Sequence, residues 1–250
     1  MLTKNKIKDI QSLYHKGQRE EQGLFIAEGP KIAAEIMSSD VEIDMIYALG
    51  KWRQNNREIN HPFTEISDTE LERISQLQTP NEVVVLAKQQ RPIGEPELNE
   101  HITLVLDGIQ DPGNMGTIIR TADWFGFSQI ICSPDCADIY NFKVVQSTMG
   151  SIVRVRCWYK NFDEWNIPTD VAIYGAMLQG KNIFSIEKIN KGLLVIGNES
   201  KGIREPLLSK ITNPITIQKN GRAESLNAAV AAGILMGQMV NWNEKSVSYS

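Results

Sequence analysis

Five short apolar runs in the second half of this 250-residue chain constrain its fold most. Polar residues hardly interrupt them, and helical patterns lie between them. Strands buried on both faces of a parallel sheet have this composition, whereas strands with one solvent face alternate polar and apolar residues. The predicted strands are 102–106, 129–132, 171–176, 193–196 and 215–217. With helices predicted at about 116–125 and 226–240, this half is expected to be an α/β domain.

The first 90 residues predict a smaller α/β unit. Apolar segments at 24–27, 43–48 and 83–87 are expected to be strands. Ser67 and Glu70 have the spacing of a capping box, which predicts a helix between the second and third of these strands. The periodicity of the first residues also predicts an amphipathic helix at the start.

A polar stretch separates the two halves. Residues 88–100 contain two prolines and a glycine and show no periodicity, as is typical of a domain linker. We therefore predict a domain at 1–90, a linker at 91–100 and a second domain at 101–250.

Composition and charge exclude several classes of protein. An apolar fraction of 42% excludes a mainly disordered chain. No apolar run approaches the roughly 20 residues that span a bilayer, and the start lacks the apolar stretch of a secretory signal, so we expect a cytoplasmic protein without membrane contact. Three scattered histidines and three cysteines do not complete a zinc site, so no metal is expected and the cysteines are interpreted as reduced structural residues.

The net charge of -4 argues against nucleic-acid binding by bulk electrostatics. The segment from Lys4 to Arg19 is different, because it contains five cationic residues and only one acidic residue, Asp9, which gives a local net charge of +4. Two interpretations stay open for this segment: an arm that contacts phosphates, or the solvated face of a helix.

Three polar segments follow predicted strands, and open α/β sheets bind ligands at such places. The first is Asp107–Thr117, which leads into a helix whose unpaired N–H groups suit a phosphate or carboxylate. Taken alone, Asn114 in this segment is also typical of a turn. Arg120, in the helix that follows, is also typical of a surface ion pair with Asp123.

The second segment is Gly197–Ile203, in which two glycines let the backbone lie close to a ligand. A plain β-turn is the alternative. The third segment surrounds Ser225, a natural helix N-cap, while Asn227 is either a second cap or a group that faces a site. The helix after it is apolar nearly all round, which predicts burial in a core or against another subunit.

Taken together, the three segments resemble the signature motifs of the SpoU-type (TrmH-like) branch of the SPOUT RNA methyltransferases. The similarity covers most of 102–240, and the leading segment is similar to the small RNA-binding domain that many members carry. The matching residues are Asn114 with Gly116 and Arg120, then Gly197, Glu199 and Gly202, then Ser225, Leu226 and Asn227.

This resemblance implies an α/β fold: a parallel-sheet SPOUT domain with a trefoil knot, preceded by a small α/β RNA-binding domain. It further implies a homodimer that uses S-adenosylmethionine to methylate a ribose 2′-hydroxyl, with ribosomal RNA favoured and transfer RNA possible. The implied catalytic residues are Arg120, Asn114, Glu199, Ser225 and Asn227. The implied cofactor-binding residues are Gly197, Asn198, Ile217, Leu226 and Ala228.

One stretch departs from the family. The third motif commonly reads Ile-Pro-Met-x-Gly, whereas this chain has Ile217-Gln218-Lys219-Asn220-Gly221, so the shape of that cofactor loop differs. Two other functions stay open on the sequence. One is a nucleotide-dependent enzyme on a conventional Rossmann sheet, with Asp135 as the ribose-binding acid. The other is a non-enzymatic RNA-binding factor of ribosome assembly.

Overall fold

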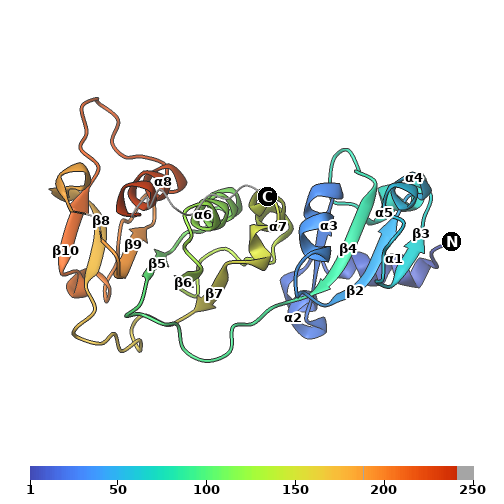
Figure 1. Ribbon diagram of the computed structural model, residues 1–250, viewed down its shortest axis with the longest axis horizontal. Helices are drawn as coiled ribbons and strands as arrows, with labels where there is room; N and C mark the ends of the chain where they lie inside the picture. Colours follow the sequence, from blue (N-terminus) through green and yellow to red (C-terminus); the bar gives the residue numbers. More distant parts are fainter. Residues whose placement is uncertain (188, 241–250) are drawn as a thin grey trace.

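The computed structural model describes residues 1–187 and 189–240, and the chain forms two β-sheet units side by side along the long axis (Figure 1). The N-terminal unit has a four-stranded sheet and the C-terminal unit a six-stranded sheet. Residues 241–250 of the predicted second domain lie outside the described residues.

The N-terminal sheet has the strand order β1-β4-β2-β3, in which β4 is antiparallel to both neighbours and β2 and β3 are parallel. The three predicted strands are confirmed to within one residue, while β3, only three residues long, was not predicted. The strands are β1 (Leu24–Glu28), β2 (Ile43–Ala48), β3 (Phe63–Glu65) and β4 (Val83–Lys88).

Five short helices surround this sheet. The predicted capping box is confirmed: Ser67 accepts a hydrogen bond from the Glu70 amide, and the Glu70 carboxylate accepts one from the Ser67 amide. The start forms two helices rather than one, because the chain leaves the helical path at residues 13–15. The helices are α1 (Lys4–Ser12), α2 (Lys16–Gln22), α3 (Pro30–Met37), α4 (Gly50–Asn55) and α5 (Asp68–Ile74).

The basic start is not a free arm. Arg19 is only 3% exposed, donates to the carbonyls of Leu13 and Tyr14, and forms an ion pair with Asp138, with 2.5 Å between Nη2 and Oδ2. The interpretation as a phosphate contact is therefore wrong for Arg19, because its guanidinium is already used inside the protein. Lys4 and Lys8 lie exposed on α1, as the alternative of a solvated helix face predicted.

The C-terminal sheet has the strand order β10-β8-β9-β5-β6-β7, and all its strand pairs are parallel, as predicted. The edge strand β7 was not predicted, because its arginine and tyrosine are exposed and leave no apolar run. The strands are β5 (Ile102–Asp107), β6 (Gln129–Cys132), β7 (Arg156–Tyr159), β8 (Ile173–Asn182), β9 (Gly192–Gly197) and β10 (Asn213–Thr216).

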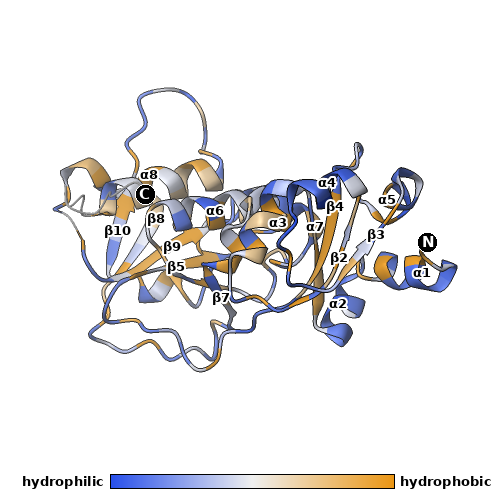
Figure 2. Cartoon of the chain, turned by 45° about the vertical axis from the view of Figure 1, so that its right-hand side comes forward, coloured by the Kyte–Doolittle hydropathy of each residue, from blue (hydrophilic) through white to orange (hydrophobic). Residues whose placement is uncertain are grey.

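Three helices cover one face of this sheet: α6 (Pro112–Trp124), α7 (Phe142–Thr148) and α8 (Ala228–Met239) (Figure 1). Loop segments that carry Phe162, Trp165 and Leu207 pack against the other face. The central strands β5 and β9 are mostly hydrophobic, as their orange colour in Figure 2 shows. Within the described ranges, no helix has both the length and the apolar content to cross a membrane.

Helices α6 and α7 pack closely because of Gly116. A Cβ atom at Gly116 would lie 2.4 Å from the Ser147 Cβ and 2.7 Å from the Val144 carbonyl oxygen. Any larger residue would push the helices apart. Gly116 therefore acts in helix packing and lies inside α6, whereas the sequence suggested a loop up to this position.

The two units share one hydrophobic cluster and several polar contacts. The Phe25 and Tyr140 rings lie 4.9 Å apart between centroids, and the Tyr140 hydroxyl bonds both the amide and the carbonyl of Gln90. Arg154 joins Glu35 of α3 to Asp123 of α6. Together with the buried Arg19–Asp138 pair, these contacts fix the N-terminal unit against α6 and α7.

Candidate active site

The three polar segments begin at the carboxyl ends of parallel strands. Asp107 at the end of β5 pairs in register with Gly197 at the end of β9, so the first two segments leave the sheet side by side. The third segment follows β10, which is separated from β9 by β8. This is the edge at which open α/β sheets place their ligands.

Side chains from all three segments meet at Asn114. Its Nδ2 donates to Glu199 Oε1 at 2.6 Å, and its Oδ1 accepts from Asn227 Nδ2 at 2.9 Å. The Asn227 Oδ1 in turn caps α8 by accepting from the amides of Ala229 and Val230. This cap fixes the direction of the Asn227 amide, which in turn fixes Asn114. Among the described residues, Glu199 Oε2 forms no hydrogen bond, so it can accept one from a ligand.

The start of α6 is occupied by the protein's own carboxylate. Asp111 is the N-cap and accepts from the Asn114 amide at 2.7 Å, and Pro112 follows as the first helical residue. The expectation that this helix start offers its N–H groups to a phosphate or carboxylate is therefore wrong for the Asn114 amide. The turn interpretation of Asn114 is also wrong, since Asn114 lies in the first turn of α6.

The segment after β9 forms a tight loop that hydrogen bonds hold in place. A Cβ atom at Gly197 would lie 2.2 Å from the Gly202 carbonyl carbon, and residues Asn198 and Gly202 exchange two backbone hydrogen bonds. The Asn198 side chain donates to the Gly108 carbonyl at 2.8 Å and accepts from two amides of its own loop. The loop tip with Glu199 is exposed but its base cannot move freely.

An ion cluster that the sequence analysis missed lies beneath this loop. Arg204 contacts the buried Asp107 through Nε at 3.0 Å and Nη2 at 2.5 Å, and its amide donates to the other Asp107 oxygen at 2.7 Å. Its Nη1 and Nη2 contact the two Asp135 oxygens at 2.9 and 3.0 Å. These bonds lower the pKa of Asp135 to about 2 and raise the pKa of Arg204.

This cluster argues against the Rossmann alternative, because both oxygens of the Asp135 carboxylate bind Arg204 and are not left for a ribose. The positions of the two acids in the sequence were the available signal: Asp107 comes directly after one predicted strand, and Asp135 comes three residues after the end of another. Their common partner Arg204 lies almost 70 residues beyond Asp135 and carries no local pattern.

The third segment is open. Residues 218–227 are all exposed, and Figure 1 shows the loop between β10 and α8 projecting beyond the helices. Ile217 packs against the core, Leu226 keeps 45% of its surface exposed, and Ala228 is buried in the first turn of α8. Among the described residues, the Ser225 hydroxyl forms no hydrogen bond, so the expected N-cap is wrong: Asn227, two residues later, caps the helix.

Arg120 lies on α6, six residues after Asn114, which is about 9 Å along the helix and about a third of a turn away around it. Its side chain is exposed, and within the described ranges it has no ion-pair partner. The alternative of an ion pair with Asp123 is wrong, because Asp123 binds Arg154 at 2.8 Å.

Two large apolar side chains on α6 and α8 are exposed. Trp124, one turn after Arg120 on α6, is 81% exposed, and Val230 on α8 is 51% exposed. Six other side chains of α8 are buried, among them Leu235 and Met236, whereas Ala231 and Ile234 are only partly buried. Burial of α8 on all sides, as the sequence predicts, therefore requires more than this single chain.

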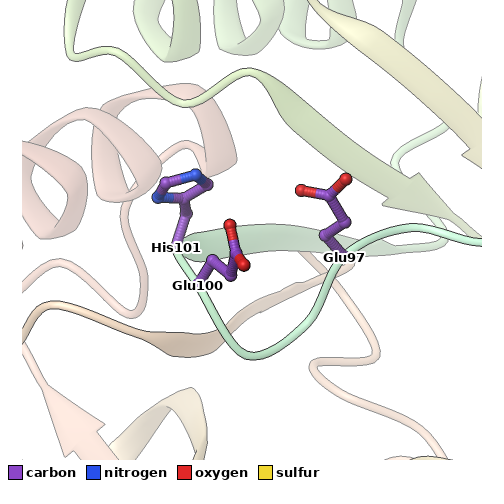
Figure 3. A group of neighbouring side chains, drawn as sticks. All are labelled: Glu97, Glu100 and His101. Atoms are coloured by element: carbon purple, nitrogen blue, oxygen red, sulfur yellow. The ribbon is translucent and has the colours of Figure 1, made fainter.

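The structure also brings together Glu97, Glu100 and His101, whose ligand atoms lie within 4.8 Å of one another (Figure 3). All three are exposed and precede β5, so they lie at the opposite edge of the sheet, about 17 Å from Asp107 along a six-residue strand. Because exposed acidic groups often lie together without a metal, we assign them no part in the site. The three cysteines are free and buried.

A parallel sheet with three polar loops joined through one asparagine defines an α/β protein with a candidate ligand site at the carboxyl edge of its strands. The family model "SpoU rRNA Methylase family" matches residues 101–237, and the chain belongs to this family. A second model, "MRM3-like substrate binding domain", matches residues 4–85.

Relatives of known name extend over nearly the whole chain. The 23S rRNA (guanosine(2553)-2′-O)-methyltransferase RlmP of Bacillus subtilis is 29% identical over 92% of this chain and 94% of its own length. Among solved structures, an AdoMet-bound rRNA methyltransferase from Sinorhizobium meliloti has a TM-score of 0.84 at 29% identity, covering 96% of this chain and 95% of that chain. A TrmH-family RNA methyltransferase structure from Porphyromonas gingivalis has a TM-score of 0.82 at 32% identity, with 96% and 98% coverage.

Proposed function

We propose that this protein is an S-adenosylmethionine-dependent RNA methyltransferase that methylates a ribose 2′-hydroxyl in ribosomal RNA. The observation that carries the proposal is the hydrogen-bonded row of Glu199, Asn114 and Asn227, one residue from each of the three segments. The family membership and the named activity of the Bacillus subtilis relative support the same reaction and favour ribosomal over transfer RNA.

The residues at the carboxyl edge suit the proposed cofactor. Gly197 and Asn198 begin a loop whose backbone is held in place, Ile217 and Ala228 supply apolar surface, and the half-exposed Leu226 offers a side chain that a flat aromatic base can cover. These five residues would hold the adenosine and methionine parts. Bound S-adenosylmethionine supplies a methyl group on a cationic sulphur, which a ribose 2′-oxygen takes up as it loses its proton.

Arg120 is the proposed catalytic residue. A guanidinium stays charged in proteins, so Arg120 does not act as the base. It binds the phosphate next to the target ribose with two parallel hydrogen bonds and stabilises the negative charge that develops on the 2′-oxygen. The proton leaves to that phosphate or to water. The exposure of Arg120 and its lack of a partner among the described residues leave the guanidinium available for this role.

The remaining catalytic candidates position the substrate. Asn114 orients the ribose through the donor and acceptor capacity that Glu199 and Asn227 leave unused. Glu199 braces the cofactor loop against α6. Ser225 lies two residues before Asn227. Its exposed hydroxyl forms no hydrogen bond among the described residues, so it too is available to position the substrate.

A homodimer and a trefoil knot complete the proposal. Trp124, one turn after Arg120 on α6, and Val230 on α8 are exposed apolar side chains, and a partner subunit seated on them would bury the open face of α8. The knot is proposed from family membership. The three free, buried cysteines fit a cytoplasmic, reducing location. The N-terminal unit, at predicted residues 1–90, is proposed to bind the RNA, and its match to a substrate-binding model supports this.

The decisive experiment has two arms. Calorimetry with S-adenosylmethionine and NAD identifies the cofactor, and transfer of a labelled methyl group to ribosomal and to transfer RNA identifies the substrate. We expect S-adenosylmethionine to bind and ribosomal RNA to be labelled at a 2′-oxygen. Binding of NAD alone, or no binding at all, would overturn the proposal, and the second result would favour a non-enzymatic assembly factor.

The role of Arg120 has its own test. Arg120→Ala should lower kcat by at least about 100-fold, because the stabilisation of the developing charge is lost, while the Kd for S-adenosylmethionine stays within about twofold of the wild-type value. Arg156→Ala, which removes an exposed arginine on the far edge strand, is the matched control. A variant at position 120 that keeps most of its kcat contradicts the assignment.

A further inference from the structure

The ion cluster of Arg204, Asp107 and Asp135 joins the ends of three strands. The Arg204 backbone belongs to the segment after β9, Asp107 ends β5, and Asp135 lies in the turn after β6. All three strands are already held by backbone pairing, with Asp107 opposite Gly197 and Leu106 opposite Cys132. The sheet therefore does not need the cluster to hold its strands together.

The contacts of Arg204 act beyond the strand ends, on the loops. Its guanidinium spans Asp107 and Asp135 and also lies 3.4 Å from the Ser133 hydroxyl, which accepts from the Gly108 amide. Gly108 has a φ of +72°, and a Cβ atom there would lie 3.2 Å from Arg204 Nη2. The turn after β5 is thus shaped around the guanidinium.

The same turn after β5 also holds the loop 197–203 through a second contact, made by Asn198. Asn198 donates to the Gly108 carbonyl at 2.8 Å, and Glu199, the next residue, bonds Asn114 at 2.6 Å. The position of Glu199 over α6 is therefore set at one side by Asn198 and at the other by Arg204. Because Asp107 is buried, loss of the guanidinium leaves a carboxylate without a cationic partner beneath the loop, bonded only to the backbone amide of residue 204.

We propose that Arg204 is a positioning residue for the cofactor loop: by binding Asp107 and Asp135 it holds residues 197–203 in the conformation that binds S-adenosylmethionine. This inference rests on the proposed function. It assigns Arg204 no contact with the reacting atoms. Loss of Arg204 therefore weakens cofactor binding and leaves RNA binding by the N-terminal unit unchanged.

The experiment measures both affinities in the full-length protein by calorimetry and by an RNA mobility shift. Arg204→Met should raise the Kd for S-adenosylmethionine by about 10- to 100-fold, the range expected when charged hydrogen bonds are lost. Asp135→Asn should raise it less than about threefold, because the bonds to Asp107 remain and Asp135 is exposed. The Kd for RNA should stay within about twofold in each variant.

Arg204→Lys keeps the proposal testable if Arg204→Met does not fold. Lysine keeps a charge near the buried Asp107 but cannot span both carboxylates, so we expect a folded protein with a several-fold higher cofactor Kd. Arg156→Met, which removes an exposed arginine far from the loop, is the control for loss of a cation.

Three results would overturn the proposal. The first is a folded Arg204→Met or Arg204→Lys protein with the wild-type cofactor Kd. The second is an equal rise of the cofactor and RNA Kd values, which indicates general loss of folded protein. The third is an Asp135→Asn effect as large as that of Arg204→Met. If the wild-type protein itself binds no S-adenosylmethionine, the proposed function fails before this inference is reached.

Discussion

Two loops of the candidate site differ in how they are held. Residues 197–203 are fixed by backbone bonds within the loop, by Asn198 on Gly108 and by Arg204 on Asp107. Residues 218–227 are all exposed, and among the described residues their backbone amides donate no hydrogen bond. Both loops follow strands of the same parallel sheet.

From this difference we expect the loop 197–203 to be preformed and the loop 218–227 to become more ordered when a ligand or a partner binds. A fixed loop binds without losing conformational freedom, whereas an open loop loses that freedom on binding. The open loop ends in Asn227, which is itself fixed, since it caps α8 and bonds Asn114. The two loops therefore meet in one rigid row of side chains.

Substitution of one glycine in each loop should reveal the difference between the loops most strongly. Gly197→Ala places a Cβ atom 2.2 Å from the Gly202 backbone, so the fixed loop has to open, and the cofactor Kd should rise by about 100-fold. Gly221→Ala adds a Cβ atom with no other atom within 4 Å, so its Kd should stay within about threefold. Equal effects of the two changes would show that the loops do not differ.

Substitutions of Asn227 test the row that joins the loops. Asn227→Asp keeps the oxygen that caps α8 but points a second acceptor at the Asn114 Oδ1, so Asn114 has to turn away from Glu199. We expect a kcat about 10-fold lower with an unchanged melting temperature. Asn227→Ala should instead lose about 1 kcal/mol of stability as well, because the cap is gone. An Asn227→Asp enzyme with full kcat would exclude a role for the row.

Hydrogen exchange should measure the difference in order between the two loops without any mutation. In the free protein, amides 218–227 should exchange rapidly and amides 202 and 204 slowly, because only the latter are hydrogen-bonded. S-adenosylmethionine should slow exchange at 218–227 by several-fold and change the fixed loop little. Strong protection by the cofactor at the fixed loop alone would reverse our assignment of the two loops.

The smallest expected effect is a pH dependence at the fixed loop. Arg204 lowers the pKa of Asp135 from its ordinary value of 3.8 to about 2, so the ionised carboxylate stabilises the folded state. This contribution is fully present above pH 5 and is lost as the pH falls from about 4 towards 2. Asp135→Asn should therefore cost less than about 1 kcal/mol at pH 7, since the pair is partly exposed, and the difference from wild type should vanish near pH 2 in urea unfolding.

Most strands could be predicted from the sequence, because burial on both sheet faces selects uninterrupted apolar residues at each strand. The edge strand β7 and the three-residue β3 could not, since edge positions leave polar residues exposed. The capping box at Ser67 was predicted because both partners lie three residues apart. The N-cap of α8 was misplaced at Ser225, because serine and asparagine are equally good caps and only the path of the loop selects Asn227.

The sequence by itself determined the parallel α/β fold and the three polar segments, since both depend on residues close together along the chain. Which side chains of these segments meet depends on the folded arrangement of the strands. The bonds of Asn114 to Glu199 and Asn227, of Arg204 to Asp107 and Asp135, and of Arg19 to Asp138 all join residues far apart in sequence. Such contacts depend on the order and register of the strands, which no local pattern encodes.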